Sequence, residues 1–167
     1  MNFRFRSFSE EETFHFGRAL GTALLPGVTV LLFGELGTGK TALVRGVGDA
    51  LGTTRVRSPS FTLVNEYLTS RFTLVHADLY RLEPEDVEGL GLDEDGGEPR
   101  ALLIEWPDRW RSPPRDALKV FIEFIKIDMG IGRMFEAISE GVKAEATLQN
   151  WIAALKREGA VNEQRDG

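Results

Sequence analysis

Alternating and periodic apolar positions divide the chain into short strands and amphipathic helices. Residues 3–6 alternate phenylalanine with arginine, which predicts a strand with one buried face. Ser9 precedes three glutamates and indicates a helix start, because a serine cap and acidic charge both stabilise a first turn. The apolar stripe of that helix stops before Pro26 and Gly27, where we expect the helix to end.

The next segments read as a strand, a helix and a hairpin. Residues 28–33 are nearly all apolar and predict a buried parallel strand, while 40–51 carry one apolar face and predict a helix. Two β-rich runs, 61–68 and 71–77, are separated by Thr69-Ser70 and predict a hairpin. A short acidic helix is expected to open at Pro84.

The second half of the chain is richer in strands. "ALLIE" at 101–105 is an apolar strand that ends on an acid, and 117–127 with 132–138 form a strand pair around Gly130. Residues 144–155 predict an amphipathic helix, followed by a polar tail at 159–167 that we expect to be disordered. Because strands and helices alternate early, the chain is predicted to be a single α/β domain over residues 1–158.

One loop in this pattern carries a phosphate-binding signature. Gly34, Gly39, Lys40 and Thr41 fit the spacing G-x-x-x-x-G-K-[ST] between the predicted strand and helix. Glycines let successive backbone N–H groups converge on phosphate oxygens at the positive end of the helix dipole. Lys40 would reach the β- and γ-phosphates and the Thr41 hydroxyl would hold Mg²⁺. A chance match in an ordinary turn would lack this strand–loop–helix context.

A nucleotide site of this kind needs acids near Mg²⁺. Glu105 ends the strand "ALLIE", where a parallel strand would deliver it beside the loop; the alternative is a solvated charge at a strand end. Asp78 also ends an apolar run, and a turn cap is nearly as good an interpretation. His76 would share a strand face with Asp78, as a structural residue or as a neighbour that orients something.

Two further features stand near these acids in the sequence. Trp106 follows Glu105 and precedes proline, so we expect an extended backbone there, with the ring as core, as a base-stacking surface or as a partner contact. "RSPSFT" at 57–62 supplies hydroxyls, including that of Ser60, on a segment that is either a plain turn or a sensor of the γ-phosphate.

Composition narrows the class of protein. A length of 167 residues suits one domain, and the absence of cysteine excludes disulfides and cysteine zinc sites. A net charge of −6 argues against a broad basic face for DNA or RNA. We expect a cytoplasmic protein with no membrane or DNA partner, because the chain shows no signal peptide and no apolar stretch long enough to span a bilayer.

Four motifs in order resemble a known family. They are "GELGTGKT", "SPSFTLVNEY", "HADLYRL" and "LIEWPDR", and together they cover about residues 9–109. They resemble the TsaE (YjeE) family, bacterial ATPases needed to make threonylcarbamoyladenosine next to the anticodon of certain tRNAs. The resemblance implies a P-loop NTPase-like three-layer domain with a mixed sheet, here followed by a strand pair and a helix. It also implies ATP and Mg²⁺ as cofactors, TsaD and TsaB type proteins as partners, and contact with tRNA only through that complex.

The same resemblance assigns the site. Lys40, Asp78 and Glu105 are the implied catalytic residues, and Thr41, Glu105 and Asp78 are the implied Mg²⁺ ligands. Trp106 repeats the family's "EW" pair, as a partner or base contact. The implied nucleotide contacts are Glu11, Gly37, Thr38, Gly39, Lys40, Thr41, Ala42, Ser60 and Arg133, of which Glu11 and Arg133 would lie near the adenine. Beyond Arg109 only the strand pair matches, so the last helix is expected either to cover the core or to meet a partner.

Three functions are consistent with these residues. The first is an ATPase that cycles a tRNA-modifying complex and is slow when alone, because no arginine finger or dedicated base stands in a strong motif. The second is a nucleotide-gated adaptor whose hydrolysis is incidental. The third is a small-molecule kinase, for which Arg109, Arg111 and Arg115 would have to form a lid.

Overall fold

The structure is a computed structural model that describes residues 1–53, 56, 63–94 and 96–160. Its strands are β1 (Asn2–Ser7), β2 (Thr29–Phe33), β3 (Val64–Leu68), β4 (Thr73–Asp78), β5 (Arg100–Glu105), β6 (Ala117–Ile127) and β7 (Gly130–Glu140). Its helices are α1 (Glu10–Ala23), α2 (Lys40–Ala50), α3 (Pro84–Glu88), α4 (Val142–Arg157) and the short 3₁₀ helix η1 (Pro107–Arg109). The predicted tail at 159–167 lies mostly outside the described residues, so its disorder stays a prediction.

All seven strands join one sheet in the order β1-β7-β6-β2-β5-β4-β3. The central strands β6, β2, β5 and β4 are parallel to one another, whereas β3, β7 and β1 pair antiparallel with their neighbours. Both predicted strand pairs are therefore present, as the antiparallel pairs β3–β4 and β6–β7. This mixed sheet with helices confirms the predicted α/β class.

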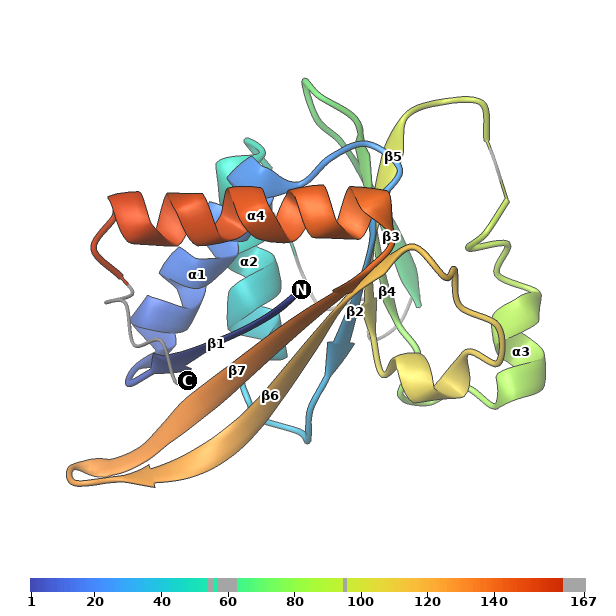
Figure 1. Ribbon diagram of the computed structural model, residues 1–167. Helices are drawn as coiled ribbons and strands as arrows, with labels where there is room; N and C mark the ends of the chain where they lie inside the picture. Colours follow the sequence, from blue (N-terminus) through green and yellow to red (C-terminus); the bar gives the residue numbers. More distant parts are fainter. Residues whose placement is uncertain (54–55, 57–62, 95, 161–167) are drawn as a thin grey trace.

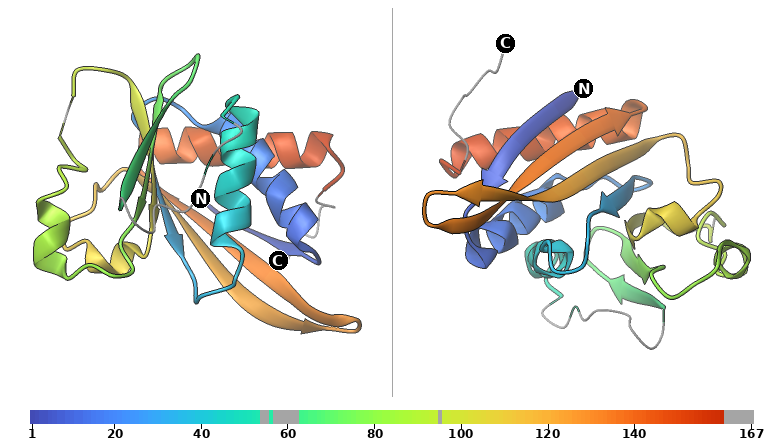
Figure 2. Two further views of the ribbon diagram at one scale, coloured as in Figure 1. Left: turned by 180° about the vertical axis from the view of Figure 1, so that it is seen from behind. Right: turned by 90° about the horizontal axis from the view of Figure 1, so that it is seen from below.

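Helices cover the two faces of the sheet unequally (Figure 1 and Figure 2). α1, α2 and α4 pack on one face, and their buried side chains form the larger core with residues such as Phe5, Leu32 and Leu103. Of the described helices, α3 and η1 lie on the other face, around a smaller core that includes Leu31 and Ile104. The ends of β6 and β7 extend past the sheet as a long hairpin.

Two glycines let α1 and α2 pack almost backbone to backbone. A Cβ atom on Gly17 would lie 2.0 Å from the carbonyl oxygen of Leu43, and one on Gly46 would lie 2.0 Å from that of Phe14. Farther along both helices, a Cβ on Gly21 would meet the Val47 carbonyl oxygen at 2.7 Å. Later residues of α1 therefore contact later residues of α2, so the two helices run in the same direction. Their N-termini lie side by side.

The ends of α1 and the position of α4 follow from specific hydrogen bonds. Ser9 caps α1 as predicted, with its Oγ accepting from the Glu12 N–H at 3.1 Å. Trp151 of α4 is buried and donates its indole N–H to the Phe16 carbonyl oxygen at 3.0 Å. The last helix therefore covers the core, which is one of the two positions that the sequence allowed.

Candidate functional site

The loop between β2 and α2 has a conformation that requires glycine. Gly37 and Gly39 have φ angles of 80° and 108°, in the region that side chains with a Cβ rarely adopt. Gly39 is also crowded, because a Cβ there would lie 3.3 Å from the Thr13 side chain and 3.4 Å from that of Arg133. The loop then enters α2 at Lys40, so the strand–loop–helix context predicted for a phosphate site is present.

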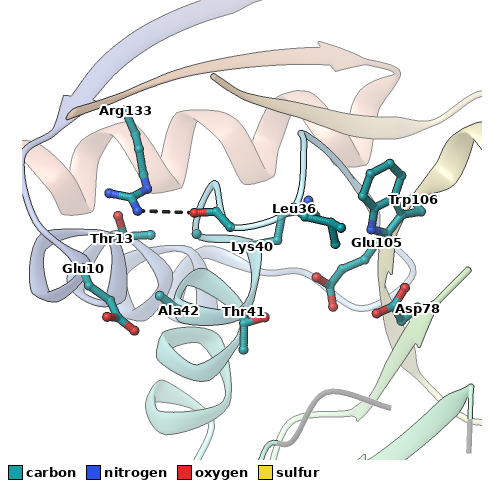
Figure 3. A pocket seen from close by; sticks show the side chains of 12 residues that line it. Glu10, Thr13, Leu36, Lys40, Thr41, Ala42, Asp78, Glu105, Trp106 and Arg133 are labelled. Carbon is teal, nitrogen blue, oxygen red and sulfur yellow. Dashed lines mark hydrogen bonds between the residues drawn. The ribbon is translucent and has the colours of Figure 1, made fainter. Parts of the chain in front are cut away.

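A cavity of about 330 Å³ lies over this loop (Figure 3). It is lined by Glu10, Thr13, Leu36, Gly37, Gly39, Lys40, Thr41, Ala42, Asp78, Glu105, Trp106 and Arg133. The side chains come from α1, the loop, α2, the ends of β4 and β5, and β7. Gly37 and Arg133 are 96 positions apart in the sequence and meet at this cavity, where an Arg133 N–H donates to the Gly37 carbonyl oxygen at 3.3 Å.

Lys40 is the buried cation of the cavity. Its ammonium donates to the carbonyl oxygens of Gly34 and Glu35, the latter at 2.8 Å, and lies 4.6 Å from the centre of the Trp106 ring. Burial lowers the pKa of Lys40, and the nearby carboxylates of Glu105 and Asp78 oppose that shift. A phosphate would supply the negative charge that this partly desolvated ammonium favours.

The two predicted acids meet at the edge of the sheet. Asp78 and Glu105 are directly opposite in the parallel pairing of β4 with β5, and Glu105 also pairs with Leu32 near the end of β2. Burial raises the pKa of Asp78, partly offset by the hydrogen bond that Oδ1 accepts from the Tyr80 N–H at 3.0 Å. Glu105 is buried, with Oε2 2.7 Å from Nε2 of His76. Asp78 both caps a local turn and lines the cavity. The two alternatives that its sequence position allowed, a turn cap and a site residue, are therefore compatible.

Trp106 corrects one expectation of the sequence. Its backbone is left-handed, with φ 57° and ψ 51°, and not extended as the following proline suggested. This conformation turns the chain from β5 into η1 and leaves the ring against Tyr80, with ring centroids 4.7 Å apart, and against Lys40. A positive φ is uncommon for a large side chain and costs on the order of 1–3 kcal/mol, so the surrounding contacts must hold it.

The far end of the cavity differs in detail from the predicted residues. Arg133 lines it as expected, but on α1 the lining residues are Glu10 and Thr13, whereas Glu11 points elsewhere, with Oε1 3.8 Å from His15 Nε2. Glu10 and Thr13 are three apart on a helix, so they share a face, and this spacing is the signal that would have found Glu10. Leu36 is a further lining residue that the sequence analysis does not name.

One predicted residue, Thr38, stands apart from the cavity wall, and another, Ser60, is not described by the structure. Thr38 is buried behind the loop, where its hydroxyl donates to the Glu35 carbonyl oxygen at 2.8 Å. The Ser60 segment, 57–62, lies outside the described residues. Of the three arginines that a kinase lid would need, Arg109, Arg111 and Arg115, none is among the described lining residues.

The donors present suit Mg²⁺ bound together with phosphate. Within the described ranges, no three histidine, cysteine or acidic side chains converge to hold a metal by themselves. Thr41, Asp78 and Glu105 nevertheless line the same cavity and offer only oxygen atoms. Mg²⁺ prefers oxygen ligands and is commonly held by one or two carboxylates together with substrate phosphates, so these residues fit that ion.

The fold and the cavity define a class. A parallel strand, a glycine loop with a buried lysine, a helix and two strand-end acids make this a P-loop NTPase-like protein. Residues 7–130 match the family model described as threonylcarbamoyl adenosine biosynthesis protein TsaE, and the chain belongs to that family. Among the described helices, none combines the length and the apolar composition that a membrane span requires.

Individual relatives agree with this assignment. The chain is 42% identical over 120 residues to a tRNA threonylcarbamoyladenosine biosynthesis protein TsaE from Nostoc, covering 69% of this chain and 74% of the relative. It is 32% identical over 155 residues to the Bacillus subtilis protein of that name, covering 88% and 98%. The crystal structure of Bacillus subtilis YdiB superposes with a TM-score of 0.74 at 27% identity, covering 92% of this chain and 95% of YdiB. The structural similarity thus continues past residue 130, into the second half that the family motifs leave out.

Proposed function

We propose that this chain is a Mg²⁺-dependent ATPase that binds a TsaD–TsaB pair and cycles it during formation of threonylcarbamoyladenosine in tRNA. The proposal is carried by one observation: Lys40, Thr41, Asp78 and Glu105 line a single cavity over the glycine loop. Membership of the TsaE family supports the tRNA pathway. The partners are inferred from that membership.

The chain's own groups would bind and orient ATP by charge and hydrogen bonding. The glycine loop and the start of α2 present backbone N–H groups to the phosphates, and Lys40 exchanges its carbonyl partners for phosphate oxygens. Thr41 and Glu105 would hold Mg²⁺, which would neutralise charge on the β- and γ-phosphates, and Asp78 would either join them as a ligand or act on the attacking water. Arg133 and Thr13 close the opposite end of the cavity, where the rest of the nucleotide would extend.

Asp78 is the candidate for the acid that orients the attacking water. In hydrolysis the water oxygen bonds to the γ-phosphorus, the bond to the ADP oxygen breaks, and the water proton passes to a base or to phosphate. The raised pKa of Asp78 makes its carboxylate a better proton acceptor than an ordinary aspartate. Its hydrogen bond from Tyr80 occupies one carboxylate oxygen and keeps the other available.

We expect the isolated chain to hydrolyse ATP slowly. The cations among the described lining residues are Lys40 and Arg133, and Arg133 already contacts the Gly37 carbonyl oxygen. In other P-loop enzymes, a cation supplied by a partner can raise kcat by several orders of magnitude. Here the TsaD–TsaB pair would supply that cation.

The test combines ATP hydrolysis with tRNA modification. Purified protein would be assayed alone and with TsaD–TsaB, with Lys40→Ala as the inactive control. Multi-turnover threonylcarbamoylation that requires this chain and fails with the control is the expected result. Full modification without this chain would refute the proposal, and hydrolysis that is equally fast with and without partners would refute completion of the site by TsaD–TsaB.

A variant at Glu105 separates an enzyme from an adaptor. Glu105→Ala should bind ATP weakly in the presence of Mg²⁺ and lose modification together with hydrolysis. If this variant binds ATP, lacks hydrolysis and still supports full modification, the chain is a nucleotide-gated adaptor and its hydrolysis is incidental.

A further inference from the structure

The side chain of His76 makes one hydrogen bond among the described residues, and its partner is the buried carboxylate of Glu105. Its Nε2 lies 2.7 Å from Glu105 Oε2, and the two side chains are 2% and 4% exposed. Nδ1 is buried and has no hydrogen-bond partner within the described residues. An imidazole that served only to join structural elements would be expected to use both ring nitrogens, since a buried polar atom without a partner costs stability.

With Glu105 ionised, the contact has only one possible donor. An ionised carboxylate only accepts hydrogen bonds, so the proton between the two atoms belongs to Nε2 of a neutral ring or of an imidazolium. In the neutral ring Nδ1 is then the bare acceptor, which agrees with its having no partner. In this tautomer the Nε2–H of His76 donates a hydrogen bond to Oε2 of Glu105.

The strand register explains why this residue reaches Glu105. Asp78 pairs with Glu105, and His76 pairs with Leu103, two residues earlier along each strand. Since alternate residues of a strand share a face, His76 lies on the Asp78 side and behind the cavity wall. It therefore holds the Glu105 carboxylate from the protein interior, while Glu105 itself lines the cavity.

We propose that His76 is a positioning residue: its Nε2–H fixes one oxygen of Glu105 and so presents the carboxylate to the metal ion bound with nucleotide. The inference rests on the proposed Mg²⁺–ATP function and adds the residue that orients its ligand. No other hydrogen bond to the Glu105 side chain is present among the described residues. Without the imidazole, the carboxylate would be free to rotate in the cavity wall, and metal binding would have to order it again.

Metal affinity is the readout that a purely structural role would not move selectively. Mn²⁺ binding in the presence of a non-hydrolysable ATP analogue would be followed by electron paramagnetic resonance. Residues that orient a metal ligand typically contribute 10- to 100-fold in metal affinity, so His76→Leu should weaken Mn²⁺ binding by about 10-fold or more. His76→Gln places an amide N–H near the position of Nε2 and should recover most of that affinity.

Two controls separate positioning from general damage. Affinity for the nucleotide in excess EDTA should be the same in wild type, His76→Leu and His76→Gln, because the phosphate loop is untouched. Thr147→Val removes another buried polar atom without a partner, on α4 and away from the cavity, and should leave Mn²⁺ binding unchanged.

The outcomes are distinct. If His76→Leu binds Mn²⁺ as tightly as wild type, or if His76→Gln is as weak as His76→Leu, this inference is wrong while the proposed function stands. If nucleotide binding by the wild type does not depend on metal, both the proposed function and this inference are wrong. Should the leucine variant not fold, ¹⁵N spectra of wild-type histidine decide: a ring protonated at Nδ1 alone overturns the proposal.

Discussion

Asp78 lies directly opposite Glu105 in the parallel pairing of β4 with β5, so two acids end neighbouring strands at the same level of the sheet. Burial is the main cause of the raised pKa of Asp78, and the like charge of Glu105 adds to it. The Lys40 ammonium lies close enough to both acids to offset part of this cost. The charges of the site are therefore balanced as a group, and changing any one of them should alter the others.

Removing the Lys40 side chain should abolish tight nucleotide binding with little effect on folding. Lys40→Ala deletes the buried cation that would contact the phosphates, while its carbonyl partners, Gly34 and Glu35, are in a loop that solvent can reach. We expect a loss of at least about 10-fold in ATP affinity, since a charge-assisted hydrogen bond contributes roughly 1.5–3 kcal/mol. Titration with a fluorescent ATP analogue measures it.

Lys119→Ala is the matched control for that variant. Lys119 pairs with Glu140 at 2.8 Å on the surface of β6 and β7, away from the cavity. Its removal should leave ATP affinity unchanged, and equal losses in the two lysine variants would argue that net charge, and not the position of Lys40, governs binding.

Asp78→Asn should lower activity and raise stability. Loss of the proton acceptor should reduce hydrolysis by about 10²-fold or more. Because burial raises the pKa of Asp78, its charged form is less favourable in the folded protein than in the unfolded chain. We expect nucleotide-free Asp78→Asn to melt about 1–2 °C above wild type at pH 7.

The pH dependence of that stability difference has a definite sign. A carboxyl group whose folded pKa is raised favours the folded state below its unfolded pKa of about 3.9 and loses this advantage as the pH rises through the folded value. The gain in Tm from Asp78→Asn should thus be small near pH 4 and larger at pH 7. A gain that shrinks between pH 4 and pH 7 would contradict the raised pKa.

Gly17→Ala should separate the two helices that frame the cavity. The new Cβ would meet the Leu43 carbonyl oxygen at 2.0 Å, and relief requires α1 to move from α2. Overpacking of this kind costs about 1–3 kcal/mol, which corresponds to roughly 5 °C in Tm for a protein of this size. ATP affinity should fall as well, because Glu10 and Thr13 of α1 line the cavity.

Gly89→Ala provides the comparison for this helix-packing variant. A Cβ on Gly89 would lie 3.5 Å from the Asp86 carbonyl oxygen, an ordinary contact, and its φ of −70° suits alanine. Thermal unfolding by circular dichroism should show almost no change for this variant. If both glycine variants lose the same stability, close packing of α1 on α2 is not the cause.

Arg133→Ala tests the contribution of β7 to the nucleotide site. The side chain lies over the loop, bonds the Gly37 carbonyl oxygen and stacks on Phe124, with Cζ 5.6 Å from the ring centre. Losing one hydrogen bond of roughly 1 kcal/mol should weaken ATP binding about fivefold by isothermal titration calorimetry. Arg4→Ala, which removes an exposed arginine paired with Glu136, should not weaken it.

The sequence by itself determined most of the helices and strands and predicted most of the residues that line the cavity. The spacing G-x-x-x-x-G-K-T between a predicted strand and helix predicted a phosphate loop, because it encodes a backbone path that few other residue types allow. Strand-end position identified Asp78 and Glu105, since parallel strands deliver their last residues to the same edge. The sequence also predicted the cap at Ser9 and both strand pairs. Local hydrogen bonding determines the cap, and patterns of apolar residues indicate the strands.

Only the tertiary structure decided which distant residues share the site. Arg133 was implied by the family resemblance, but it reaches the loop only because β7 pairs with β6. Glu10 lines the cavity because Gly17 and Gly46 let α1 lie against α2. Trp106 departs from the local preference set by Pro107, since contacts with Tyr80 and Lys40 accompany a left-handed turn. The bond from His76 to Glu105 likewise depends on the register of two strands that are 22 residues of chain apart at their nearest ends, from Asp78 to Arg100. Long-range packing sets such contacts, and no local pattern of residues encodes it.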